Sequence, residues 1–120
     1  MFQIIFNEIS AAEISQLPTE SQLDLLEEFK VTPEDLENLD TRKFARIERD
    51  GKVLYRYRAK GCRIYFEVAD EGVVVHRVLS KNTFRDFFYR SKLPVREGET
   101  ISRSKVFWEL IEEGQRARRV

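Results

Sequence analysis

Apolar and polar residues alternate with two different periods along this chain, and the change of period divides it. Residues 2–6 carry apolar side chains at every second position, which is typical of a strand. Between residues 10 and 41 the apolar positions recur at helical spacing. From about Arg46 the period becomes two residues and remains so to Leu79. The pattern predicts an α+β protein: an N-terminal strand and helices packed on one face of an antiparallel β-meander, with a C-terminal helix.

Capping residues predict where the first helices begin. The candidate caps are Ser10 with Glu13, Thr19 with Gln22, and Thr32-Pro33-Glu34-Asp35. Pro18 ends the first of these helices. The second is predicted to bury Leu23, Leu26 and Phe29 and to expose its acidic residues, while the third directs Leu36 and Leu39 inward.

Two turns organise the predicted meander, one at Lys60-Gly61 and one at Asp70-Glu71-Gly72. If Lys60-Gly61 is a two-residue loop, or the centre of a four-residue one, opposed residues have numbers that sum to 121. Arg58 then lies opposite Arg63, and Arg56 lies opposite Tyr65 on the same face. The alternate residues of both strands face the core.

The last helix is predicted over 102–114, after a loop that contains Pro94 and Gly98. Its apolar stripe is formed by Val106, Phe107, Leu110 and Ile111, and Gly114 is its stop. Trp108 falls off that stripe, so either it marks a partner surface or the whole helix packs on its own sheet. We expect the tail 116–119 to fray. Phe84, Phe87 and Phe88 are interpreted as core residues.

Length and composition limit the kind of protein. A chain of 120 residues has the size of one domain, in which we distinguish an acidic part (1–41), a basic meander (46–80) and the final helix. With a single cysteine, Cys62, and one histidine, the sequence predicts neither a disulfide nor a metal site, and we expect no cofactor. No apolar run approaches a membrane span, and the N-terminus does not resemble a signal peptide, so we expect a cytoplasmic protein.

The net charge of zero hides a segregation of the two signs. Residues 1–41 hold ten acidic residues and one basic residue, a net charge of −9, and residues 42–120 hold twenty basic and eleven acidic residues, a net charge of +9. Either the two halves pair with each other in the folded protein, or the basic half presents a surface to a polyanion.

The predicted hairpin brings three arginines together beside a tyrosine. Like charges directly opposite on a sheet destabilise it, so Arg56, Arg58 and Arg63 favour an anion such as a phosphodiester, and Tyr65 is placed to stack on a base. The alternative is that these arginines pair with Glu67, Glu48 or the acidic helices. His76 has two readings as well, a general base or a structural strand residue.

The hairpin sequence resembles the RelE/ParE superfamily of toxins from bacterial toxin–antitoxin pairs. The resemblance is carried by residues 55–68 (YRYRAKGCRIYFEV), followed by an acidic turn and Val73-Val74-Val75, and it covers about 45–89. It implies a metal-independent endoribonuclease that represses translation by cutting mRNA on the ribosome, with an antitoxin as partner. Cleavage in such toxins uses attack of the RNA 2′-hydroxyl on the adjacent phosphate.

The resemblance also implies roles for individual residues. Arg56 and Arg58 match two catalytic basic positions, Arg63 matches the arginine that stabilises the transition state, and Tyr89 matches a tyrosine that stacks on the base or aids proton transfer. The predicted RNA-binding residues are Lys60, Tyr65, Lys81 and Arg85.

Departures from the family pattern keep other functions open. Thr83 stands where the family has a second arginine, although Lys81 and Arg85 lie nearby, and Cys62 replaces a turn tyrosine. Arginine is a poor proton acceptor, which weakens the general-base role of Arg56 and Arg58. The alternatives are a ParE-like inhibitor of DNA gyrase without nuclease activity, and a catalytically dead relative that dimerises or binds antitoxin. A homodimer is a further expected partnership.

Overall fold

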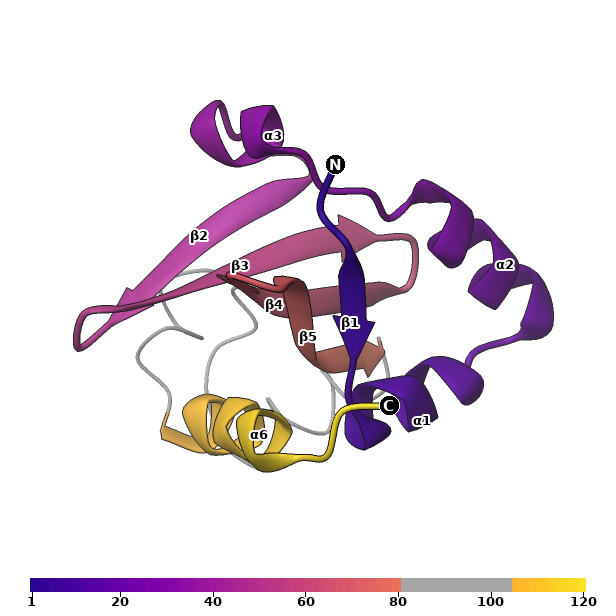
Figure 1. Cartoon of the computed structure of the whole chain (residues 1–120). Coiled ribbons are helices and arrows are strands. Elements are labelled where there is room, and N and C mark those ends of the chain that lie inside the picture. Colours follow the sequence, from indigo (N-terminus) through magenta and orange to yellow (C-terminus); the bar gives the residue numbers. More distant parts are fainter. Residues whose placement is uncertain (81–104) are drawn as a thin grey trace.

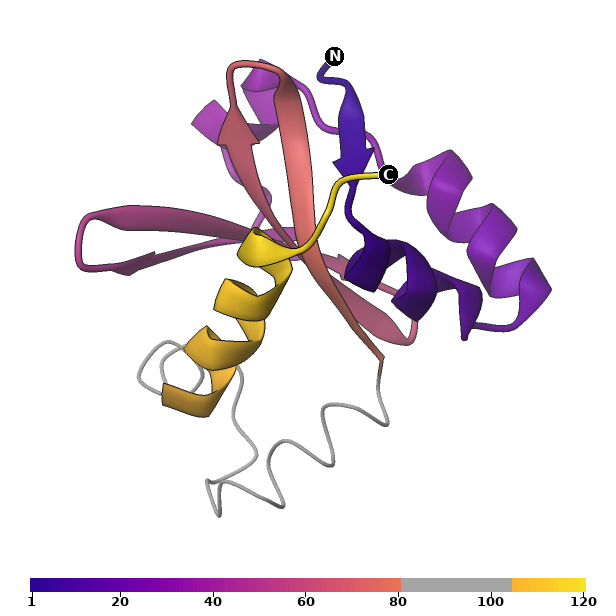
Figure 2. The same ribbon diagram turned by 60° about the horizontal axis from the view of Figure 1, so that its bottom comes forward.

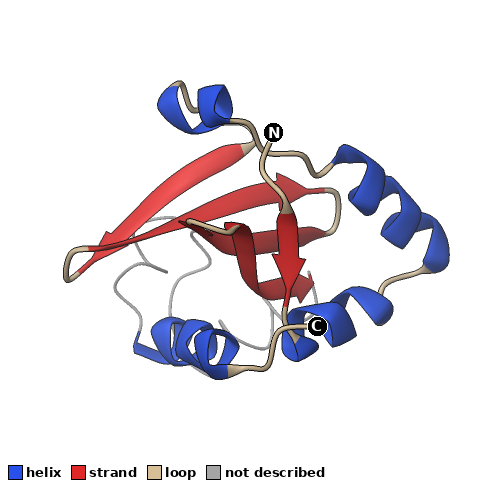
Figure 3. Cartoon of the chain, viewed as in Figure 1, coloured by secondary structure: helices blue, strands red, loops and turns tan. Residues whose placement is uncertain are grey.

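A computed structural model describes residues 1–80 and 105–120 of the chain. The described residues form a mixed α+β structure with five strands and four helices (Figures 1 and 3). In chain order these are β1 (Ile4–Phe6), α1 (Glu8–Ser15), α2 (Thr19–Glu28), α3 (Pro33–Glu37), β2 (Phe44–Arg49), β3 (Lys52–Ala59), β4 (Cys62–Ala69), β5 (Gly72–Ser80) and α6 (Lys105–Arg116).

The five strands form one sheet in the order β1-β5-β4-β3-β2. Strands β3 to β5 are the predicted antiparallel meander with its two turns. Strand β2, which the sequence did not predict as a separate strand, adds antiparallel to β3, and β1 pairs in parallel with β5. The antiparallel part begins at Phe44, two residues before the predicted start of the meander. The β2–β3 turn, Asp50-Gly51, has positive φ at both residues (51° and 78°), which is the geometry that Asp-Gly supplies between hairpin strands.

The capping predictions are partly corrected. The N-cap of α1 is Asn7, whose side chain accepts from the Ser10 backbone, so Ser10 is the third helical residue and not the first cap. Thr19 is already inside α2, where Pro18 occupies the cap without a side-chain bond. The box of Thr32 and Asp35 is confirmed, with both reciprocal hydrogen bonds present.

Helix α2 turns a different face inward from the one predicted. Leu25 is 6% exposed, whereas Leu23 and Leu26 are 64% and 54% exposed. The predicted stripe relied on Phe29 continuing the helix, but the helix ends at Glu28 and Phe29 takes an extended conformation that carries its ring into the core.

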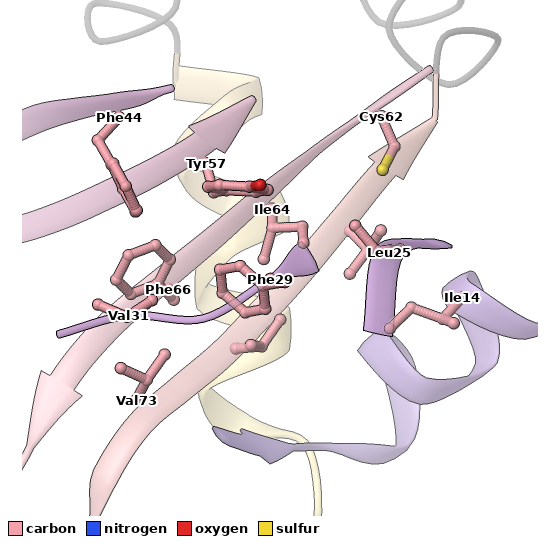
Figure 4. Packing of buried hydrophobic residues seen from close by; sticks show 12 residues of the cluster. Ile14, Leu25, Phe29, Val31, Phe44, Tyr57, Cys62, Ile64, Phe66 and Val73 are labelled. Atoms are coloured by element: carbon pink, nitrogen blue, oxygen red, sulfur yellow. The ribbon is translucent and has the colours of Figure 1, made fainter. Parts of the chain in front are cut away.

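The main hydrophobic core lies between one face of the sheet and the N-terminal segments (Figure 4). Phe66 is fully buried at its centre, with the rings of Phe29 and Tyr55 at centroid distances of 5.7 and 5.6 Å. Phe44 and Tyr57 close the cluster at the β2 side, 5.2 Å apart. We call this side of the sheet the first face.

Helix α6 covers the opposite side, which we call the second face (Figure 2). Phe107, Trp108 and Ile111 pack there against sheet residues Ile47, Leu54, Tyr65 and Leu79. Trp108 is 6% exposed, so of the two readings of this residue the structure favours packing on the chain's own sheet. The predicted start at residue 102 lies outside the described residues.

Gly114 is not the stop of α6, which continues to Arg116. A Cβ atom at Gly114 would lie 2.3 Å from the carbonyl oxygen of His76. The glycine is therefore required by the close approach of the helix to β5, where any side chain would collide with the backbone.

The C-terminal tail is held and does not fray as expected. The backbone N–H of Glu8 donates to the carbonyl of Arg118 at 2.7 Å, and that of Val120 donates to Phe6 at 3.1 Å. Arg119 also pairs with Glu71. The tail thereby ties the end of α6 to the junction of β1 and α1.

No helix in the described ranges is long and apolar enough to cross a bilayer.

Candidate functional site

The predicted register of the β3–β4 hairpin is confirmed. Arg58 lies directly opposite Arg63 and Arg56 lies opposite Tyr65, with Ala59 and Cys62 closing a two-residue turn. The four residues share the second face, because Tyr57, Ile64 and Phe66 all belong to the first-face core. The hairpin therefore places two arginines side by side at its turn end, and a third arginine one step further in.

The side chains near the turn differ in their exposure. Arg58 and Lys60 are exposed, and Arg63 is half-buried. The Nη1 atom of Arg63 donates to the carbonyl oxygens of Ala59 at 3.2 Å and Cys62 at 3.0 Å. These bonds hold the Arg63 guanidinium against the turn. We call Arg58, Lys60 and Arg63 the basic turn.

The inner pair of the predicted set is buried. Arg56 is 6% exposed and Tyr65 is 0% exposed. The Tyr65 ring meets Phe107 of α6 edge-on, with centroids 4.9 Å apart. A nucleobase has no access to the Tyr65 ring while α6 lies on the second face, so the predicted stacking role of Tyr65 does not fit this structure.

The two carboxylates considered as alternative partners for the arginines are bonded elsewhere. Glu48 pairs with Arg46 at 2.6 Å, and Glu67 pairs with His76 at 2.8 Å. The acidic helix α2 packs over the first face, on the other side of the sheet from the basic turn. Both carboxylates therefore have partners outside the basic turn.

His76 occupies an irregularity in β5. The β4–β5 register shifts between Tyr65 and Phe66, which leaves His76 as the extra residue of a β-bulge. Its side chain is 6% exposed and its Nε2 atom contacts Glu67. Because Leu79 is the residue opposite Arg63, His76 lies three positions away from the basic turn along β5.

The bulge also directs Arg77 toward the helices, and this residue was missed by sequence reasoning. Its guanidinium bonds to Glu13 of α1 at 2.9 Å and to the Leu110 carbonyl of α6 at 3.1 Å, with Glu113 at 3.3 Å. Glu13 also accepts from the backbone N–H of Val78 at 2.9 Å. Glu13, predicted as a capping residue, instead joins α1 to the sheet.

Asn7 was missed for a similar reason. Its side-chain amide donates to the carbonyls of Val75, His76 and Gly114 at 3.2, 3.1 and 2.8 Å. One buried amide thus links the start of α1, strand β5 and the end of α6. The sequence offers no signal for contacts across such separations.

Proton transfer has few candidates among the described groups. Burial raises the pKa of the Cys62 thiol, against the opposing effect of the Arg63 charge, so the thiol stays protonated at neutral pH. Arginine does not release its proton at ordinary pH. The two arginines of the basic turn can therefore hold an anion and stabilise negative charge, but they do not accept a proton.

Part of the predicted site is not described. Lys81, Arg85 and Tyr89, with Thr83 at the departing position, lie outside the described residues. Phe84, Phe87, Phe88, Pro94 and Gly98 lie outside them too. Within residues 1–80 and 105–120, no three His, Cys, Asp or Glu side chains come together to hold a metal ion.

Comparison of the chain with family models, with curated proteins and with solved structures found no match. The RelE/ParE resemblance therefore stays a prediction from the residues of the hairpin.

Proposed function

We propose that this protein is a toxin of the RelE/ParE type, which binds RNA through its basic turn and represses translation by cutting mRNA. The observation that carries the proposal is the direct opposition of Arg58 and Arg63 across the hairpin. Its partners in the cell would be mRNA on the ribosome and an antitoxin protein.

The opposed arginines favour a polyanionic ligand for an electrostatic reason. An anion placed between two guanidinium groups at directly opposed positions of an antiparallel pair is attracted by both positive charges at once. Guanidinium groups hold phosphate oxygens in a two-point geometry that lysine does not reproduce. Lys60, exposed at the turn itself, adds a third positive charge for the adjacent backbone phosphate.

Arg63 is the member of the basic turn best suited to the transition state. Its guanidinium is already oriented by the carbonyls of Ala59 and Cys62, so little rearrangement is needed when charge develops on the phosphate. In the proposed reaction the RNA 2′-hydroxyl attacks the neighbouring phosphorus, and the 5′-oxygen of the next nucleotide leaves. The proton acceptor is expected among the residues beyond Ser80, where the resemblance assigns Tyr89 to base stacking or proton transfer.

A second function is favoured by the burial of Arg56 and Tyr65. Two of the residues assigned to catalysis or RNA contact do not reach the surface, and a ParE-like inhibitor of DNA gyrase needs no catalytic set. The same observation fits a catalytically dead relative that retains only antitoxin binding.

The proposal is tested by induced expression of the wild type, Arg63→Ala and Arg118→Ala in a bacterial host. Arg118 is exposed in the tail and its backbone carbonyl, which the substitution keeps, makes the structural bond, so its replacement removes the same charge away from the basic turn. We expect growth arrest with new mRNA ends, mapped by primer extension, for the wild type and Arg118→Ala. Both effects should be absent for Arg63→Ala.

Each other outcome has a defined meaning. Arrest without new mRNA ends would support the gyrase inhibitor, and absence of arrest would support the dead relative. Circular dichroism of purified Arg63→Ala distinguishes loss of function from loss of folding. In RNA-binding titrations, the slope of log affinity against log salt should fall by about one for Arg63→Ala, as expected when one phosphate contact is lost, and should not change for Arg118→Ala.

A further inference from the structure

Strand β2 forms an outer edge of the sheet (Figure 1). In the part of the chain that the structure describes, β3 is the single strand that pairs with it. The opposite edge is different, because the segment that contains β1 has further backbone bonds: the N–H of Phe2 donates to the carbonyl of Val31, and the carbonyl of Phe6 accepts from the N–H of Val120. With respect to residues 1–80 and 105–120, β2 therefore presents backbone donors and acceptors at alternate residues of its outer edge, which another strand can use.

The charges on β2 follow a particular order. Arg46 and Glu48 point to the first face at alternate positions, with side chains 52% and 59% exposed and an ion pair of 2.6 Å between them. Ile47 lies between them and is buried in the second-face core. Along β2, a positive side chain and a negative side chain therefore stand on the same face, one on each side of the buried Ile47.

This order is complementary to itself when the strand is reversed. In an antiparallel pair of two β2 strands centred on Ile47, opposed residue numbers sum to 94. Arg46 of each copy then lies opposite Glu48 of the other copy, which gives two cross-strand pairs of opposite charge. The neighbouring two-fold registers are worse, since they place Arg46 opposite Arg46 or Glu48 opposite Glu48 at the axis.

We propose that the protein forms a two-fold symmetric dimer in which two β2 strands pair antiparallel about Ile47 and extend the sheet across both copies. A two-fold axis perpendicular to the sheet keeps the faces of both copies aligned, so the first-face and second-face cores remain undisturbed. A second copy is the occupant that the pattern selects, because it supplies the opposite charge at both positions. The dimer does not depend on the proposed toxin function.

The test uses charge reversal at the two positions in the full-length chain. In R46E homodimers the introduced carboxylate would face Glu48, and in E48R homodimers the introduced guanidinium would face Arg46. Because each change acts twice in a symmetric dimer, we expect the dimer dissociation constant to rise by roughly tenfold or more in each variant. Sedimentation velocity over a concentration series measures it, and circular dichroism checks the fold.

Mixing the two variants isolates the contact between copies. An equimolar mixture of R46E and E48R restores opposite charges across the interface, while each chain still carries like charges at its own positions 46 and 48. We expect heterodimers close to wild-type affinity in the mixture, and recovery of the homodimer in the doubly reversed R46E/E48R chain. Arg42→Glu, which reverses an arginine just outside β2, should leave the dissociation constant within about twofold.

Two outcomes would overturn the proposal. A wild-type chain that stays monomeric at the highest accessible concentration would mean that the charges of β2 protect the edge from pairing. A dimer that survives both single reversals, or a mixture that associates no better than its components, would assign the interface to another surface.

Discussion

The two faces of the sheet are built from alternate residues of the same strands, but they bury different chemistry. The first face holds apolar side chains almost throughout, with Phe66 at the centre of an aromatic cluster. The second face buries a smaller apolar set under α6, and next to it Arg56 and His76, which are 6% and 5% exposed. A buried polar group is tolerated when it is bonded, as His76 is to Glu67 at 2.8 Å.

The charge segregation of the sequence follows the same division. The acidic residues of α2 lie over the first face, and the basic turn lies on the second. The pair Glu13–Arg77 joins the two halves over a long sequence separation, and Asp40–Arg42 joins them at their boundary. Both of these pairs lie away from the basic turn.

The largest expected effect distinguishes the buried side of α2 from its exposed side. Leu25→Ala removes a side chain from the first-face core and should lower the free energy of unfolding by about 2–5 kcal/mol. Leu26→Ala makes the same chemical change one residue later, where the side chain is 54% exposed, and should stay within about 0.5 kcal/mol of the wild type. Urea denaturation followed by circular dichroism measures both.

The helix propensity of the two leucines is the same, so the matched pair removes that contribution from the comparison. Equal losses would mean that Leu26 is covered in solution, and a negligible loss at Leu25 would contradict the orientation of α2.

A smaller effect is expected at the contact between α6 and the second face. Gly114→Ala places a methyl group against the His76 carbonyl, 2.3 Å away, so α6 must shift from β5. We expect a loss of about 1–3 kcal/mol, since this strain exceeds the gain in helix propensity. Because Trp108 belongs to the same helix and packs against the second face, its fluorescence should also change in the folded protein.

Gln115→Ala serves as the control, because that side chain is exposed in the same turn of α6. A stabilised Gly114→Ala protein with unchanged fluorescence would show that the helix and β5 do not approach closely in solution.

The sequence was informative at two places where a local pattern determines the structure, although capping signals of the same kind misplaced the helix starts at Ser10 and Thr19. The Lys60-Gly61 turn set the register of β3 and β4, because a two-residue loop leaves one pairing open to the flanking strands. The Thr32 capping box was predicted for the same reason, since its donors and acceptors lie within four residues.

Other errors arose where contacts distant in sequence decide the outcome. The helical periodicity predicted that Leu26 is buried and not Leu25, because it assumed that the helix continues to Phe29. The helix ends at Glu28. The sequence pattern likewise predicted the face of the hairpin arginines but not the burial of Tyr65, which depends on α6 packing across that face from the other end of the chain.

The smallest expected effect concerns Cys62, which lies in the first-face core directly beside Arg63 of the basic turn. Burial raises the pKa of its thiol, so the folded protein holds this proton more tightly than the unfolded chain does. The resulting stabilisation is complete below the pKa of the unfolded thiol, about 8.5, and is lost as the pH rises toward the higher folded pKa. We therefore expect the stability difference between wild type and Cys62→Ala to shrink between about pH 7 and about pH 9.5.

Urea denaturation of both proteins across this range measures the difference. Burial also raises the pKa of Tyr57, with smaller contributions from Glu28, Cys62 and Asp35, but an unfolded tyrosine has a pKa of about 10, so most of its titration lies above this pH range. If the free energies of unfolding of the two proteins change with pH in parallel, the thiol is solvated in the folded protein. The Arg63 charge opposes the rise in the pKa of Cys62, so Arg63→Ala should make the loss of stability with pH steeper. This change would show that the charge of the basic turn acts on a thiol in the first-face core.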